Sequence, residues 1–332
     1  MKQLSYILIL CILFSCKEAP KSNIQEVKNT KISGPVFGTS FSTIYASETD
    51  YTKQFDSLFN VINQSMSTYI TDSDISRINR NESTLIDDHF KRVLMRSKDI
   101  YGKTNGVFDP TIGAVVNAWS FGPKGEVVDL DSLKINELMK SVGLHKVELT
   151  SVYNIKKPEN TFIDFNAIAK GYGVDVIGEF LESKGIQNYL VEIGGEIRVR
   201  GKNMEKGTSW RVGLDEPRFD GGQSVYKAIS LTDEAMATSG TYRKFKTDAS
   251  GNRYAHIINT KTGYPTKTNI LSVSVIAKDC MTADAYATAF QAMGIDKVSH
   301  FLQSHPELKV FIIFENENKE FETLNLNEFP KS

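Results

Sequence analysis

Residues 161–185 read TFIDFNAIAKGYGVDVIGEFLESKG. The first five, 161–165, are mostly β-branched or aromatic and predict a short strand. Residues 167–184 then carry apolar side chains at helical spacing, and Gly185 follows as a stop signal. This stretch therefore predicts a short strand that leads directly into a helix.

Similar patterns extend on both sides of this stretch. Strands are predicted at 37–45, 187–200 with a break at Gly194-Gly195, 210–214, 226–231, 256–258, 270–277 and 308–314. Helices are predicted along apolar stripes at 55–66, 90–101, 283–293 and 296–303. The sequence of residues 34–332 contains no repeat, low-complexity segment or linker. We therefore interpret it as one large α+β domain of mixed sheets and helices.

The overall composition narrows the class of protein. The 332 residues are 40% hydrophobic, which is enough to bury a core and argues against disorder. Lys and Arg number 39 against 40 Asp and Glu. The resulting net charge of -1 offers no broad basic field, which argues against a general nucleic-acid binder. Only Cys11, Cys16 and Cys280 are present, too few for a disulfide framework.

The N-terminus has the pattern of an export signal. An apolar run at 4–14 is too short for a transmembrane helix, and Leu-Phe-Ser-Cys at 13–16 resembles a bacterial lipobox. We predict a signal peptide at 1–15, a lipidated Cys16, and a flexible tether at 16–33. The protein is then expected in the bacterial cell envelope, held to the membrane by its lipid and facing the periplasm or the outside. An ordinary secretory signal, cut elsewhere, is the alternative.

Asp284 and Thr288 lie four residues apart on a predicted helix and project from the side opposite its apolar stripe. A carboxylate and a hydroxyl one turn apart are hard oxygen ligands. They suit Mg²⁺, which takes few protein ligands and completes its shell with phosphate and water. The alternative is that Asp284 only favours the helix dipole, with Thr282 as the cap. The residues alone leave both interpretations open.

Residues 167–171, Ala-Ile-Ala-Lys-Gly, open the predicted helix. Backbone N–H groups at a helix start attract phosphate. Lys170 places a positive charge in the first turn, against the helix dipole, and an anionic ligand would explain it. A solvated surface lysine is the alternative. Glycine-punctuated turns at 106–111 and 192–196 stand beside acids, but most such turns are ordinary loops.

His256 begins a predicted strand that runs into a tight turn at 259–265. A lone histidine in this position is either a structural residue or a catalyst. The other four histidines have no metal-like spacing, which argues against a zinc site. The sequence has no G-x-S-x-G elbow, P-loop or Rossmann glycine pattern, so the hydrolase and nucleotide-binding classes that use them are excluded.

Taken in order, these segments resemble the ApbE family of flavin transferases, the FAD:protein FMN transferases, over nearly all of residues 34–314. The matching segments are FGT at 37–39, GVFDP at 106–110, DFNAIAKGYGVD at 164–175, IGGEIRVRG at 193–201, TSG at 238–240, HIINTKTGYP at 256–265 and ADAYAT at 283–288. Phe37 replaces the family's methionine, and Asn259-Thr260 replaces its Asp-Pro, which removes no metal ligand. The resemblance implies an ApbE-like, T-fold-like α+β domain.

The resemblance also implies roles for particular residues. Mg²⁺ would be held by the carbonyl of Ala167 together with Asp284 and Thr288. FAD, as the substrate, would be contacted by Phe37, Tyr69, Val107, Phe108, Asp109, Asp164, Lys170, Glu196, His256 and Ile258. His256 and Asp284 are the predicted catalytic residues. A carboxylate near the metal or His256 would take the proton of the attacking hydroxyl, and the sequence favours neither.

The family's reaction would be the transfer of FMN from FAD to a threonine hydroxyl of an exported acceptor protein. The hydroxyl would attack the flavin-side phosphorus, with Mg²⁺ polarising the phosphorus–oxygen bond, and AMP would leave. The acceptor would be a flavoprotein subunit of a membrane redox complex. Two alternatives are a Mg²⁺-dependent FAD pyrophosphatase, which yields FMN and AMP, and a lipoprotein that binds FAD without catalysis. The intact pair Asp284 and Thr288 argues against the last.

Overall fold

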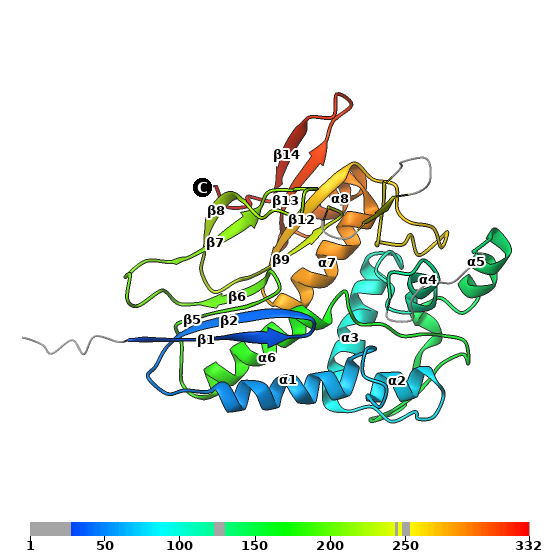
Figure 1. Cartoon of the computed structure of the whole chain (residues 1–332), viewed down its shortest axis with the longest axis horizontal. Helices are drawn as coiled ribbons and strands as arrows, with labels where there is room; N and C mark the ends of the chain where they lie inside the picture. Colours follow the sequence, from blue (N-terminus) through cyan, green and yellow to red (C-terminus); the bar gives the residue numbers. More distant parts are fainter. Residues whose placement is uncertain (1–27, 123–129, 243–244, 248–252, 332) are drawn as a thin grey trace, which may run out of the picture.

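The computed structural model describes residues 28–122, 130–242, 245–247 and 253–331. This part of the chain is built on an eight-stranded sheet whose neighbouring strands are all antiparallel (Figure 1). In spatial order the strands are β1 (Asn29–Val36), β2 (Thr39–Ala46), β5 (Tyr189–Ile193), β6 (Glu196–Arg200), β9 (Ala235–Gly240), β12 (Ile270–Ala277), β13 (Lys309–Glu315) and β14 (Phe321–Leu326). The predicted α+β class is confirmed.

Two central helices cover one face of this sheet. α6 (Ala169–Ser183) packs on β5 and β6, α7 (Cys280–Met293) packs on β9 and β12, and the two helices contact each other. α1 (Thr52–Met66) and α3 (Asp88–Lys103) form an outer layer against α6 and α7 (Figure 1). The main apolar core lies between these layers. The apolar stripes that predicted these four helices are therefore the faces that build the core.

The opposite face of the sheet is covered by the hairpin of β7 (Trp210–Asp215) and β8 (Val225–Leu231). Buried and exposed residues alternate along β7 from the buried Trp210 onward, as expected for a strand with one face on a core. Met236 of β9 packs with this hairpin, whereas the next residue, Ala237, packs with the core beneath α7. The two faces of β9 are thus clearly assigned.

The remaining elements are shorter, and most of them were not predicted. Of these shorter elements only α8 was predicted. The list comprises α2 (Asp74–Asn79), α4 (Gly113–Ala118), α5 (Ser132–Met139), α8 (Ile295–Leu302), the 3-10 helix η1 (Leu144–Lys146), and the strands β3 (Glu148–Ser151), β4 (Asn154–Lys156), β10 (Phe245–Thr247) and β11 (Arg253–Ala255). Elements this short span too few residues to establish a period.

The folded domain begins earlier than predicted. β1 starts at Asn29 and pairs along its whole length with β2, so the predicted tether is wrong for residues 29–33. The strand was missed because Ile32 is its one large apolar side chain before Val36. Residues 1–27, with the predicted signal peptide and Cys16, lie outside the described residues. Within the described part, no helix is both long and apolar enough to cross a membrane.

Three further strand predictions change at their ends or fail. Phe37 is not in a strand but in the turn between β1 and β2, with a positive φ of 48°. Residues 161–165 make only one isolated bridge, between Phe162 and Ile112. Residues 256–258 follow β11 and likewise make a single bridge, at Ile258. Apolar composition marked these segments as buried, but it does not distinguish a strand from a buried loop.

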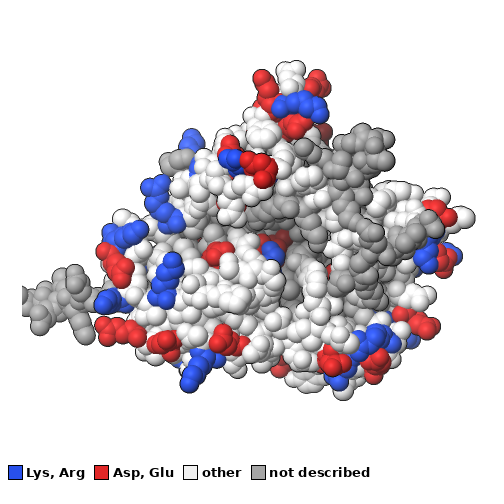
Figure 2. Space-filling view, viewed as in Figure 1, with Lys and Arg blue, Asp and Glu red and all other residues white. Residues whose placement is uncertain are grey.

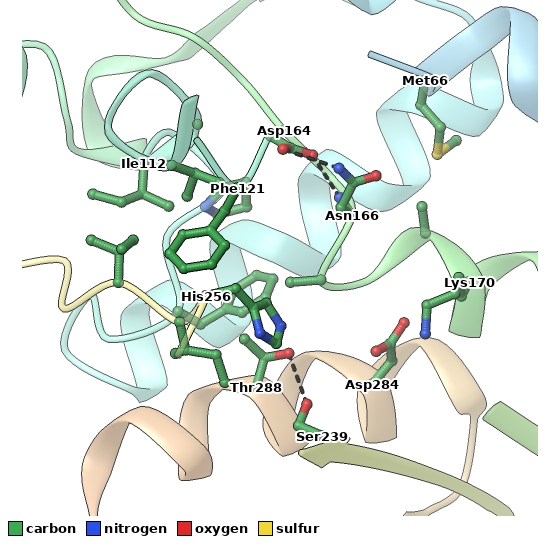
Figure 3. Close-up of a pocket in the computed structure, with 18 of the residues that line it drawn as sticks. Met66, Ile112, Phe121, Asp164, Asn166, Lys170, Ser239, His256, Asp284 and Thr288 are labelled. Atoms are coloured by element: carbon green, nitrogen blue, oxygen red, sulfur yellow. Dashed lines mark hydrogen bonds between the residues drawn. The ribbon is translucent and has the colours of Figure 1, made fainter. Parts of the chain in front are cut away.

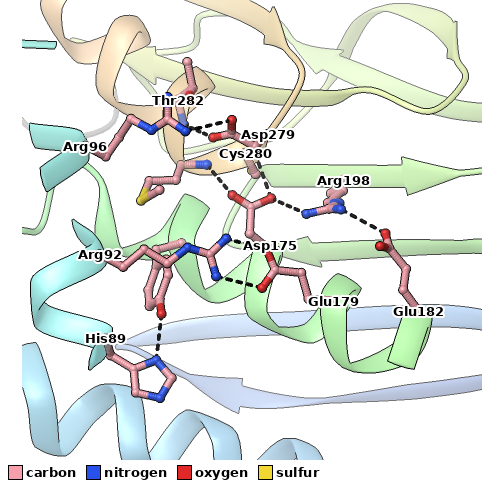
Figure 4. A network of polar contacts seen from close by, with 12 residues as sticks. His89, Arg92, Arg96, Asp175, Glu179, Glu182, Arg198, Asp279, Cys280 and Thr282 are labelled. Atoms are coloured by element: carbon pink, nitrogen blue, oxygen red, sulfur yellow. Dashed lines mark hydrogen bonds and ion pairs between the residues drawn. The ribbon is translucent and has the colours of Figure 1, made fainter. Parts of the chain in front are cut away.

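A buried carboxylate ties the start of α7 to α6 and β6 (Figure 4). Asp175 of α6 accepts hydrogen bonds from the N–H groups of Cys280, at 3.0 Å, and Met281, at 2.8 Å. It also pairs with Arg198 of β6 at 3.0 Å. Burial and the nearby Asp279 raise the pKa of Asp175 to about 6, although Arg198 opposes them. This contact fixes how the two central helices meet, and their meeting point forms the site described next.

Candidate active site

A cavity of about 850 Å³ opens between the start of α6 and the middle of α7 (Figure 3). The end of α1 and the loops that follow α3 and β11 form further parts of its wall. The predicted site residues that line it are Phe37, Tyr69, Val107, Phe108, Asp109, Asp164, Ala167, Lys170, Glu196, His256, Ile258, Asp284 and Thr288. The structure thus brings together every predicted site residue except Cys16, which lies outside the described residues. Their individual roles stay predictions.

The floor of the cavity depends on a close approach of α6 and α7. A Cβ on Gly171 would lie 2.3 Å from the carbonyl oxygen of Cys280, so only glycine fits there. The Gly171 N–H donates to Oδ2 of Asp284 at 2.9 Å, and not to the carbonyl four residues earlier, that of Ala167. The regular helix begins only at Ala169. Ala167 therefore lies at the cavity wall with its carbonyl outside the helical pattern.

One interpretation of the sequence assigns Asp284 the role of a first-turn acid that favours the dipole of α7. The structure contradicts that interpretation. The helix begins at Cys280, and Asp279 caps it by accepting a hydrogen bond from the N–H of Thr282 at 2.8 Å. Thr282 is therefore the donor in this cap and not the cap itself. Asp284 lies one turn further on and is only 4% exposed. A carboxylate buried at a cavity wall needs partners, and the helix dipole does not supply them.

Lys170 and Glu196 form a charged pair beside Asp284. The ammonium of Lys170 lies 2.5 Å from Oε1 of Glu196, so the surface-lysine alternative is wrong. Burial opposes the charge of Lys170, but the carboxylates of Glu196 and Asp284 outweigh it and raise the pKa of the ammonium. In Figure 3 Lys170 and Asp284 point toward the same region of the cavity. The lysine therefore stays protonated and is available to an anion in the cavity.

The second oxygen of Glu196 is unusual. Oε2 is buried and has no hydrogen-bond partner, and the residue as a whole is 2% exposed. Burial raises the pKa of Glu196 to about 7, with Lys170 opposing and Asp284 adding to the shift. Burial also raises the pKa of Asp284, against Lys170 and the Gly171 N–H. Burial thus disfavours the charged forms of both carboxyl groups, and a cation bound beside them would stabilise those charged forms.

Thr288 follows Asp284 by one turn of α7, and its hydroxyl lies 3.1 Å from the hydroxyl of Ser239 at the end of β9 (Figure 3). His256 enters the cavity wall from the segment after β11, and its ring contacts that of Phe121 edge-on, with 6.2 Å between centroids. The cavity therefore combines a carboxylate, two hydroxyls and an imidazole, which are groups that bind cations and move protons.

Another part of the wall is apolar and aromatic. Phe37 occupies the β1–β2 turn, and its ring packs edge-on against Phe59 with 5.5 Å between centroids. Gly173 gives the ring room, since a Cβ there would lie 2.7 Å from it. Asp109 also lines the cavity and is buried. It accepts a hydrogen bond from the Thr111 hydroxyl at 2.6 Å, and burial raises the pKa of Asp109. Such a mixture of aromatic surface and few polar groups is typical of a site for a planar ligand.

Sequence reasoning missed part of this wall. Ile62 and Met66 of α1, taken only as core residues, also border the cavity. Ile112 and Phe121 flank the unpredicted helix α4. Ser239 lies in the TSG segment but was given no role. An apolar periodicity marks burial, and it carries no sign of whether the buried face meets protein or ligand.

The face of the molecule in Figure 2 has charged side chains of both signs mainly at its periphery. Its middle, where the surface is hollowed, is mostly white, with a few red and blue atoms in the hollow. This face therefore offers no single-sign field for nucleic acid, in agreement with the near-neutral composition.

Comparisons with known proteins agree on one family. The model of the ApbE family matches residues 37–312. The FAD:protein FMN transferase of Vibrio cholerae is 37% identical over 277 residues, which are 80% of this chain and 82% of the relative. That of Haemophilus influenzae is 34% identical over 323 residues, which are 92% of each chain.

Solved structures agree with these relatives. The flavin transferase ApbE from Vibrio cholerae superposes with a TM-score of 0.80 and 32% identity, over 90% of this chain and 97% of that one. The Pseudomonas stutzeri flavinyl transferase ApbE, in its apo form, gives a TM-score of 0.80 and 26% identity, over 90% and 94%. The fold therefore matches over nearly the whole described chain.

Proposed function

Since this chain belongs to the ApbE family and is an FAD:protein FMN transferase, we propose that it uses Mg²⁺ to transfer FMN to a threonine hydroxyl of an exported acceptor, with release of AMP. The observation that supports this best is the convergence of all the described predicted residues on one cavity. Its wall has an aromatic part and a charged part, and FAD has a planar ring and an anionic pyrophosphate.

The residues around Asp284 suit a magnesium ion. Asp284, Thr288 and the Ala167 carbonyl are hard oxygen donors, and the Gly171 N–H holds one oxygen of Asp284 in place. In the described residues no three His, Cys, Asp or Glu side chains form a metal-binding group. That absence fits a donor set with a single carboxylate. The unpartnered Oε2 of Glu196 is a further oxygen near this donor set that a bound ligand or cation could engage.

In the proposed reaction, a bond forms between the threonine oxygen and the flavin-side phosphorus, and the bond from that phosphorus to the bridging oxygen breaks. AMP leaves with the bridging oxygen. Bound Mg²⁺ would offset charge on the pyrophosphate and polarise the bond that breaks. Lys170 would hold an anionic phosphate oxygen. The proton of the hydroxyl would pass to His256 or to a carboxylate of the cavity.

The cellular setting is also a proposal. It rests on Cys16 at the end of the apolar segment 4–14, and it places the enzyme on the membrane by a lipid. The acceptor would then be a flavoprotein subunit of a redox complex exposed on the same side. Asn29, where β1 begins, follows Cys16 by a short polar segment, so the folded domain would stay near the membrane surface.

The test is incubation of the protein with FAD, Mg²⁺ and a candidate acceptor, followed by mass spectrometry of the acceptor. We expect the acceptor to gain the mass of FMN and AMP to appear in equal amount. FMN and AMP without labelled acceptor would instead indicate a pyrophosphatase, and intact FAD would indicate simple binding. Either result, with an acceptor that a relative is able to label, would overturn the proposal.

Asp284→Ala provides the matched comparison. We expect transfer to fall by orders of magnitude while the fold persists, because the variant lacks the one carboxylate of the proposed donor set. Asp279→Ala removes an acid from the same helix, away from the cavity lining, and should cost about 1 kcal/mol of stability through the lost cap. Its transfer rate should match that of the unchanged protein. Near-normal transfer by Asp284→Ala at low Mg²⁺ would refute the metal assignment.

A further inference from the structure

The hydroxyls of Ser239 and Thr288 lie 3.1 Å apart on the cavity wall (Figure 3). We propose that Ser239 is a positioning residue for the cation. Its hydroxyl oxygen accepts a hydrogen bond from the Thr288 hydroxyl and thereby turns a lone pair of the Thr288 oxygen toward the metal. The inference rests on the proposed function, in which Thr288 is a ligand of Mg²⁺, and it adds a residue that acts through Thr288.

The strand explains why Ser239 meets Thr288. Successive side chains of β9 point to opposite faces, so residues 235, 237 and 239 share one face. Ala235 and Ala237 are fully buried, and Ala237 packs in the core that contains the alanines of α7. These small residues let α7 lie close to the strand. At the next position on that face, Ser239 reaches the helix where Thr288 projects into the cavity.

The chemistry gives the hydrogen bond a direction. A hydroxyl has one proton and two lone pairs, and without a cation either Ser239 or Thr288 can be the donor. Coordination through oxygen occupies a lone pair of Thr288 and makes its proton a stronger donor. The Ser239 oxygen lies within hydrogen-bond distance of the Thr288 hydroxyl and can accept this hydrogen bond. Groups that hydrogen-bond to a metal ligand commonly orient that ligand in this way. The proton of Ser239 is then free to point into the cavity, toward an anionic oxygen.

A second hydroxyl pair, which joins β9 to the neighbouring strand β12, serves as a control. Thr238 and Ser274 share a hydrogen bond of 2.8 Å, and Ser274 is buried and does not line the cavity. Thr238 and Ser239 are successive residues of β9, so their side chains point to opposite faces of the sheet. Thr238 shares the face of Met236, which packs under the β7–β8 hairpin. Ser274→Ala therefore removes a comparable bond from the sheet without touching the Thr288 hydroxyl.

The experiment is calorimetric titration of Mg²⁺ into the full chain, with and without FAD, for Ser239→Ala, Thr288→Val and the double variant. Melting temperatures are recorded on the same samples. Ser239→Ala should weaken Mg²⁺ binding by about 10-fold. The double variant should bind no more weakly than Thr288→Val alone, because Ser239 acts only through the Thr288 hydroxyl. Ser274→Ala should bind Mg²⁺ as the unchanged protein does.

The outcomes separate the two claims. Unchanged Mg²⁺ affinity in Thr288→Val would overturn the metal site itself and thus part of the proposed function. A loss in Thr288→Val with none in Ser239→Ala would overturn the role of Ser239 alone. Additive losses in the double variant, or an equal loss in Ser274→Ala, would also overturn it. If Ser239→Ala fails to fold, Ser239→Thr, which keeps the hydroxyl, should restore both folding and Mg²⁺ affinity, and a folded Ser239→Thr without that affinity counts against the role.

Discussion

Lys170 and Glu196 illustrate how a charged pair can be kept for a ligand. Such a pair loses hydration when it is buried, and its mutual attraction recovers that loss only with good geometry and further hydrogen bonds. Here the geometry is good on one oxygen of Glu196, and the other has no partner. The pair is therefore incomplete as a purely structural device, and a ligand in the cavity would complete it.

We expect Lys170→Ala to weaken FAD binding by about 10-fold or more, since it removes a charged hydrogen-bond donor worth about 1.5 to 3 kcal/mol. The measurement is FAD titration by calorimetry. The double variant Lys170→Ala with Glu196→Gln distinguishes two causes, because it also removes the carboxylate that the first change leaves unpaired. Recovery of full affinity in the double variant would mean that Lys170 only neutralises Glu196 and contacts no phosphate.

A second prediction at this scale concerns Asp175 and pH. Its folded pKa of about 6 exceeds its ordinary value of 3.8. At a pH between these two values, Asp175 keeps its proton in the folded protein but has lost it in the unfolded chain. The contribution of Asp175 to the free energy of unfolding therefore decreases as the pH rises from 4 to 6. Asp175→Asn lacks the effect. Relative to the unchanged protein, the variant should therefore be more destabilised at pH 4.5 than at pH 7, as measured by urea unfolding.

A constant difference in the free energy of unfolding between the two proteins across that range would contradict the raised pKa. An opposite trend would mean that Arg198 and the N–H groups of Cys280 and Met281 dominate over burial. The unchanged protein and the variant share all other titratable groups, so the difference isolates Asp175.

At the scale of elements, the long periodic helices were predictable and the short ones were not. The stripe along 55–66 predicts α1, and the pattern after 167 predicts α6, because three or more turns repeat the same apolar face. Helix α6 begins at Ala169, two residues after the predicted start at 167. At this end the Gly171 N–H donates its hydrogen bond to Asp284, which is more than a hundred residues away in the sequence. No local pattern encodes that contact.

The same contact makes Gly171 a sensitive position. Gly171→Ala would place a Cβ 2.3 Å from a backbone oxygen of α7 and 2.8 Å from Cβ of Asp284, so the two helices must separate. We expect a loss of about 1 to 3 kcal/mol of stability and weaker Mg²⁺ binding, measured by urea unfolding and calorimetry. Gly102→Ala, within α3 and with no atom near its added Cβ, should be neutral or stabilising. Equal behaviour of the two variants would contradict the close packing of α6 on α7.

At the scale of the whole molecule, the membership of the cavity was predictable, but its geometry was not. The resemblance to a family placed Phe37, Lys170 and Asp284 in one site, although they lie far apart in the chain, and they do line one cavity. The pairing of Lys170 with Glu196, and of Thr288 with Ser239, depends on how helices seat on the sheet. The position of a helix on the sheet is set by the packing of many side chains, and a short sequence motif does not contain that information.

The proposed membrane attachment can be tested separately from the fold. The described domain begins with β1 at Asn29, which pairs fully with β2, and Cys16 is not among the described residues. We expect Cys16→Ser to move the protein from the membrane fraction to the soluble fraction, with the melting temperature and FAD affinity of the domain unchanged. The check is fractionation after a salt wash, with the unchanged chain alongside. Persistence of the variant in membranes would refute lipid attachment at this residue.

The cavity wall takes residues from the turn at Phe37, near the start of the domain, to Ala292, near the end of α7. A chain that lacks either end of this range therefore lacks part of the cavity wall. Flavin would bind only the finished fold and would lengthen its survival against proteases in proportion to the flavin supply. The abundance of such an enzyme would then follow its own substrate without any change in gene expression.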